Sequence, residues 1–152
     1  MEKHVIYSKS KNSDMVIARY IVHKCIDDGH PISNLQLQKI LYFIQKDFLQ
    51  KESRLAFSDS IEAWKFGPVV PEVYYHYSGF GAMPITIELS PNVSLNSEDK
   101  SKVDEIVDKL RSYSPWELVE ITHKPGGAWD KAVQTGCGYH DIIPISAIRE
   151  EE

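Results

Sequence analysis

The stretch "LQLQKILYFIQKDFL" (residues 35–49) carries the pattern of an amphipathic helix. Its apolar residues recur every three or four positions, which places them on one helix face. Ser33 or Asn34 can cap the start, and the pattern continues to about Gln50. The predicted buried face consists of Leu37, Ile40, Leu41, Ile44 and Phe48. The polar residues expected to point towards solvent are Gln36, Lys39, Gln45 and Lys46.

The segments on both sides of this stretch also carry helix signals. One helix is expected from Ser13 to about Ile26, ended by Gly29 and Pro31. The loop to the next helix is short, so the two helices are expected to pack antiparallel. Three further helices are predicted at 71–79, 97–111 and 115–123, the last beginning in the capping box "SPWE" (114–117).

The rest of the chain gives weaker signals. Alternating apolar residues predict short extended segments at 61–63 and 85–89, and "AWDKAVQ" (128–134) could add one or two helical turns. The predicted fold is therefore mainly α, a compact helical bundle of about five helices with a small β-hairpin. We expect residues 1–12 to be a flexible basic arm and residues 13–152 to form a single domain.

Composition narrows the class of protein. The chain has 152 residues, 42% of them hydrophobic and 26% charged, which is typical of a globular domain. The formal net charge of −5 argues against a binder of nucleic acid, which needs a basic face. The start lacks the apolar core of a signal peptide, and no apolar run is long enough to span a membrane. We therefore expect a cytoplasmic protein.

Motifs for catalysis, metals and cofactors are weak. Cys137, His140 and Asp141, with His123 upstream, have the right chemistry for zinc, but their spacing matches no strong zinc pattern. His123 could pair with Cys137 or Asp130 in a small hydrolase, which stays open as an alternative. No phosphate-binding loop is present. The sequence predicts no metal, no cofactor and no enzyme.

The segment "EAWKFGPVVPEVYYHY" (62–77) is unusually aromatic, with five aromatic residues in sixteen. We expect Trp64 and Phe66 to fold inward, because large aromatics dominate cores. Tyr74 and Tyr77 are three positions apart and share a helix face, whereas Tyr75 points away from it. Exposed tyrosines are favoured contacts in protein interfaces, so part of this segment is predicted to be a binding edge.

Three motifs in this order resemble the Panacea domain, the SocA-like antitoxin domain also known as GepA or phage-associated protein. They are "LQLQKILYFIQKDFL" (35–49), "AWKFGPVVPEVYYHY" (63–77) and "LVEITHKPGGAW" (118–129). The resemblance covers roughly residues 14–132. It implies a mainly helical fold and a role in neutralising a toxin, encoded by an adjacent gene, through direct binding. One branch of the family delivers its toxin to a cytoplasmic protease, and the resemblance implies no catalytic activity.

The resemblance and the aromatic segment together give the candidate residues. Those expected to be mainly structural are Leu41, Tyr42, Ala63, Gly67, His123 and Trp129. Those expected to contact a partner are Trp64, Phe66, Pro68, Val69, Tyr74, Tyr75 and Tyr77. The predicted function is an antitoxin from a phage or mobile element that binds a protein toxin. The alternatives are a proteolytic adaptor, a prophage regulator without a cognate toxin, and the small hydrolase described above.

Overall fold

A computed structural model describes residues 14–135 and 139–152 and shows a mainly helical single domain, as the sequence predicts. The predicted arm at 1–12, the Ser13 cap and Cys137 lie outside these described residues. Within them, the helices are α1 (Asp14–Asp27), α2 (Asn34–Glu52), α3 (Pro71–His76), α4 (Ser97–Leu110), α5 (Pro115–Thr122), α6 (Ala128–Thr135) and α7 (Ile145–Glu150). A 3-10 turn spans Ser78–Phe80. The strands are β1 (Glu62–Trp64), β2 (Gly67–Val69) and β3 (Asp141–Ile142).

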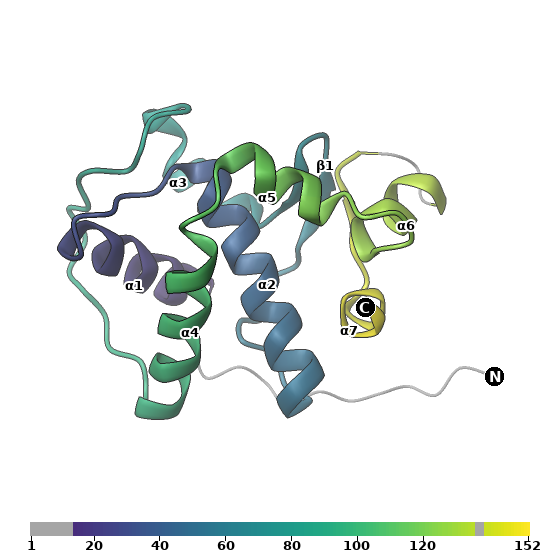
Figure 1. Ribbon diagram of the computed structural model, residues 1–152, viewed down its shortest axis with the longest axis horizontal. Coiled ribbons are helices and arrows are strands. Elements are labelled where there is room, and N and C mark those ends of the chain that lie inside the picture. Colours follow the sequence, from purple (N-terminus) through teal and green to yellow (C-terminus); the bar gives the residue numbers. More distant parts are fainter. Residues whose placement is uncertain (1–13, 136–138) are drawn as a thin grey trace.

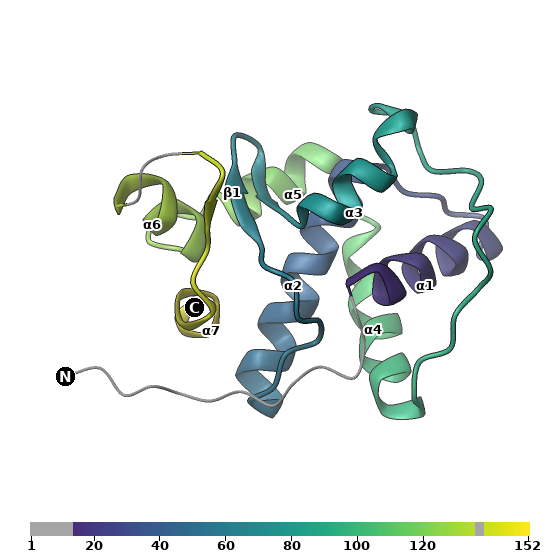
Figure 2. The same cartoon turned by 180° about the vertical axis from the view of Figure 1, so that it is seen from behind.

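Helix α2 is the centre of the domain. It contacts α1, α3, α4, α5, α7 and β2, and both figures show the other elements arranged around it (Figure 1, Figure 2). Ser33 and Gln36 form a capping box at its start, in which each side chain accepts a hydrogen bond from the other residue's backbone N–H. Because neighbours cover α2 on several sides, more of it is buried than one apolar face would require.

The prediction that the polar residues of α2 point towards solvent is therefore wrong for two of them. Lys39 and Gln45 were expected at the surface, yet their side chains are 0% and 2% exposed. Gln45 accepts a hydrogen bond from the N–H of Ala56 at 2.7 Å and donates one to the carbonyl of Phe57 at 2.9 Å. Gln38, also buried, accepts from the N–H of Val70 at 2.8 Å. These side chains hold the irregular segment 53–70 against the central helix.

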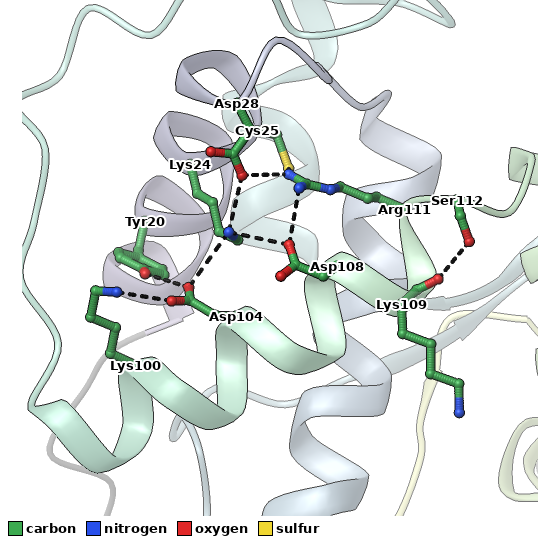
Figure 3. Close-up of polar contacts among 10 residues, drawn as sticks. All are labelled: Tyr20, Lys24, Cys25, Asp28, Lys100, Asp104, Asp108, Lys109, Arg111 and Ser112. Carbon is green, nitrogen blue, oxygen red and sulfur yellow. Dashed lines mark hydrogen bonds and ion pairs between the residues drawn. The ribbon is translucent and has the colours of Figure 1, made fainter.

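Helix α1 ends at Asp27, and the predicted stop signal Gly29 follows with a φ of +72°, where a side chain would be strained. Helix α1 contacts α2, and Figure 1 shows it inclined to α2 and extending away from it on one side. An ion-pair network joins α1 to α4 (Figure 3). Lys24 pairs with Asp108 at 3.2 Å, and Arg111 pairs with Asp28 at 2.9 Å. The network fixes α1 to α4.

The sheet differs from the two predicted extended segments. The first is confirmed as β1, and it pairs antiparallel with β2 and β3 in the order β2-β1-β3. The second, 85–89, lies in the loop 81–96 and forms no strand. Ile85 is buried and its N–H bonds the carbonyl of Ile32, but Ile87 and Leu89 are exposed. Among the described residues, no strand pairs with residues 86–89.

Among the described residues, two helices form beyond the five predicted, and the first of them, α6, falls where one or two further turns are expected at 128–134. Helix α6 follows the glycines of "KPGG", and α7 begins after Pro144, which is its N-cap. Figure 1 places both at one end of the molecule, beyond the hairpin and away from α1 and α4. No helix in the described ranges is both long and apolar enough to cross a bilayer.

Replacing Gln45 with Leu tests the role of the buried amide. The Gln45→Leu variant leaves the N–H of Ala56 and the carbonyl of Phe57 buried without these partners. We expect the free energy of unfolding to fall by about 3 kcal/mol in urea titrations. The control is Gln134→Leu, because Gln134 is exposed on α6 and donates a hydrogen bond to Asp130 of its own helix. Equal stability of the two variants would contradict the role of the Gln45 amide in holding the segment 53–70.

Candidate partner-binding surface

The hairpin of β1 and β2 presents the aromatic segment of the sequence. Trp64 pairs with Gly67 across a two-residue turn made of Lys65 and Phe66. At Gly67 the φ angle is +114°, and an added Cβ would lie 2.8 Å from both Cε of Lys39 and Oγ1 of Thr122. Glycine is therefore required at this position for two reasons. It adopts the positive φ angle, and it lets the strand approach α2 and α5 closely. This contact fixes the hairpin on the core.

Trp64 is the centre of one aromatic group on the hairpin. It is half-buried, and its ring centroid lies 4.9 Å from that of Tyr74 and 6.0 Å from that of Tyr75, both on α3. His140 lies 4.4 Å from it, before β3. The indole N–H donates to Oε1 of Glu62 at 2.9 Å. The group therefore orders Tyr75, which is 62% exposed.

The expectation that Phe66 folds inward is wrong. Its side chain is 46% exposed, because it lies in the turn of the hairpin while β2 packs on α2. Its ring meets that of Trp116 edge to face at 5.3 Å. Trp116, on α5, is 59% exposed. We define the aromatic surface as Trp64, Phe66, Tyr74, Tyr75 and Trp116.

The other residues predicted to contact a partner face inward. Pro68, Val69 and Tyr77 are buried, and the Tyr77 hydroxyl donates a hydrogen bond to Glu88 of the loop 81–96. Their side chains are not part of the aromatic surface, because β2 packs on α2 and Tyr77 closes α3 onto the core. The residues predicted to be structural include Leu41, Tyr42 and Ala63, all of which are buried in the core.

A layer of buried basic and aromatic groups lies behind the aromatic surface. Lys39 donates to the carbonyl of Pro68 at 3.0 Å, and burial lowers the pKa of its amine to about 7. The His123 ring stacks on Trp129 with centroids 3.7 Å apart. Burial and the nearby Lys39 charge both lower the pKa of His123. The Trp129 indole donates to the carbonyl of Trp64 at 2.7 Å, so this layer supports the hairpin from inside.

Of the residues named for the hydrolase alternative, the structure describes His123 and Asp130, whereas Cys137 lies outside the described residues. The Asp130 carboxylate accepts hydrogen bonds from the N–H of Gly126 at 2.9 Å and from Gln134 at 3.0 Å. Its charge opposes the lowering of the pKa of His123, but Nε2 of His123 has no hydrogen-bond partner among the described residues. Among the described residues, no three His, Cys, Asp or Glu side chains gather in a way that could hold a metal ion.

Sequence reasoning missed Trp116 and His140 as members of this region. A signal was present for Trp116, since it falls off the buried face of α5 formed by Leu118, Val119 and Thr122. No local signal identifies His140, which reaches Trp64 only because β3 pairs with β1.

Comparison with known proteins identifies the family. A family model described as "Antitoxin SocA-like, Panacea domain" matches residues 37–130, more than half of the chain. The chain belongs to this family. It is 30% identical over 125 residues to the Antitoxin SocA of Caulobacter vibrioides (strain NA1000 / CB15N), over 75% of this chain and 66% of that relative. The chain thus spans about two thirds of the relative's length. No solved structure matches it.

The family model covers some parts of this Panacea domain and leaves others outside. All five residues of the aromatic surface lie within 37–130, as do Lys39, His123 and Trp129. Helix α1, strand β3 and helix α7 lie outside it. The structure of the aromatic surface, however, uses both parts, since β3 completes the sheet.

Replacing the buried lysine should change how stability depends on pH. The pKa of Lys39 is about 7 in the folded chain and its ordinary value is 10.5, so the unfolded chain binds the extra proton between these values. The free energy of unfolding therefore rises with pH above 7 through Lys39, by up to about 1.4 kcal/mol per pH unit. We expect the unfolding free energy of wild type, measured from pH 6 to 9, to rise relative to that of Lys39→Met above pH 7. Parallel curves would contradict the lowered pKa.

Proposed function

We propose that this Panacea-domain protein is an antitoxin that neutralises a partner toxin by binding it directly through the aromatic surface. The observation that carries the proposal is the exposure of Phe66, Tyr75 and Trp116 on one family-matched region of a charged molecule. Large aromatic side chains that reach solvent are favoured anchors of protein interfaces. The relative named Antitoxin SocA supports the same role.

The aromatic surface is ordered before a partner arrives. Tyr75 contacts Tyr74 and Trp64, Phe66 contacts Trp116, and the hairpin beneath them is held by Lys39 and Trp129. Anchors with few free rotamers lose little entropy on binding, and a fixed hairpin adds no folding cost. Binding would then occlude the toxin without a large rearrangement.

Charge indicates the kind of toxin surface that fits. The exposed side of α5 carries Glu117 and Glu120 next to Trp116, and Glu62 lies beside Trp64. With a net charge of −5, the chain would attract a basic toxin surface and speed its encounter. We therefore propose a protein toxin with a basic contact face, encoded by an adjacent gene in a phage or mobile element and bound in the cytoplasm.

The experiment begins with the product of the adjacent gene, expressed with and without this chain. Tyr75→Ala and Trp116→Ala should each weaken the complex about 30-fold, or ~2 kcal/mol, and restore toxicity in co-expression. Both side chains are more than half exposed, so the fold should persist. Affinity is measured by calorimetry with the purified toxin.

Leu89→Ala is the matched control. Leu89 is 93% exposed, in the loop 81–96 that Figure 1 shows at the far end of α1 from the hairpin. The Leu89→Ala variant should bind the toxin and relieve its toxicity as wild type does. A lethal product that this chain does not relieve, or a product harmless alone, would contradict the antitoxin role. Relief accompanied by loss of the toxin, through a protease, would favour the adaptor alternative over occlusion.

A further inference from the structure

Helix α7 is attached to α2 by polar contacts made with the last residues of the chain. Gln50 of α2 donates to the carbonyl of Arg149 at 3.0 Å and to that of Glu151 at 2.6 Å. Lys46, one turn earlier, pairs with Oε2 of Glu151 at 3.0 Å. Ile148 adds the apolar contact and is 1% exposed. We call residues 145–152 the C-terminal latch.

The other carboxylate oxygen of Glu151 holds helix α6. Oε1 accepts a hydrogen bond from the N–H of Ala128, the first residue of α6, at 2.8 Å. A Cβ on Gly127 would lie 2.5 Å from this oxygen, so the glycine allows the carboxylate to approach. A carboxylate at a helix N-terminus satisfies a free N–H and complements the helix dipole. Glu151 is only 8% exposed and joins α2 to α6.

Two paths lead from the C-terminal latch to the hairpin. Helix α6 carries Trp129, whose indole donates to the carbonyl of Trp64. Strand β3, immediately before α7, pairs with β1, and the N–H of Ile143 bonds the carbonyl of Ile61 at 2.8 Å. Both figures place the hairpin between α2 and the end formed by α6 and α7. Losing the contacts of Glu151 would therefore weaken the attachment of β1 through both α6 and β3.

We infer that Glu151 is a positioning residue that fixes the aromatic surface by tying α6 and α7 to α2. It lies outside the residues matched by the family model, whereas every residue of the aromatic surface lies inside them. The inference thus concerns a part of the chain to which the family match assigns nothing. Its consequence for toxin affinity rests on the proposed function, but its consequence for the hairpin does not.

The test uses the full chain with three substitutions. Glu151→Ala removes both contacts, Glu151→Gln keeps an oxygen for the N–H of Ala128 but loses the charge opposite Lys46, and Glu150→Gln is the control. Glu150 is exposed and carries the same charge one residue earlier. Hydrogen–deuterium exchange is followed for peptides covering 61–70 and, as an internal reference, 97–110 of α4.

We expect exchange at 61–70 to become about tenfold faster in Glu151→Ala, intermediate in Glu151→Gln and unchanged in Glu150→Gln, with α4 unaffected in all three. Toxin affinity should fall in the same order, by about tenfold for Glu151→Ala. Unchanged exchange at 61–70, or an equal increase in α4, would overturn the positioning role. If wild type binds no toxin, the proposed function fails, and the exchange result still decides the role of Glu151.

Discussion

The burial of α2 is the constraint on which the rest of the structure depends. A helix surrounded by neighbours cannot keep all its polar side chains at the surface, and a buried polar group without a partner costs free energy. Gln38, Lys39 and Gln45 meet this constraint by bonding backbone groups of residues 56–70. The same bonds satisfy a segment that has little regular structure. One set of contacts thus fixes both the core and the hairpin.

The hairpin connects this core to the surface. Its inner side must come close to Lys39 and Thr122, which only Gly67 permits, and its turn then leaves Phe66 outside. Trp64 lies between the two environments, with its carbonyl bonded by Trp129 from within and its ring packed on tyrosines of α3. Aromatic groups that reach solvent while resting on a rigid base combine contact area with low entropic cost.

The part of the chain matched by the Panacea family is not a complete structural unit in this protein. Residues 37–130 include α2, the hairpin and the aromatic surface, but not the third strand of the sheet or α7. Helix α1 completes the other side, where Arg111 and Lys24 link it to α4 (Figure 3). The buried Glu151 joins α7 to the matched part through α2 and α6.

The sequence by itself determined the elements whose signals are local. The capping box at Ser114 and Glu117 starts α5 as expected, Gly29 ends α1, and the apolar spacing of 37–48 identifies the core face of α2. The three motifs, read together, also identified the family. These features depend on residues within a few positions of one another, where backbone geometry links pattern to structure directly.

Only the tertiary structure decided which polar and aromatic residues are buried. Lys39 and Gln45 lie off the apolar face and still became buried, because α2 is covered by β2 and by the segment before β1. Phe66 is exposed and Tyr77 buried, although both are aromatic residues of one segment. The alternation at 85–89 gave no strand, since no neighbouring strand lies beside it among the described residues. The burial of a side chain depends on neighbours distant in sequence, and local periodicity carries no information about them.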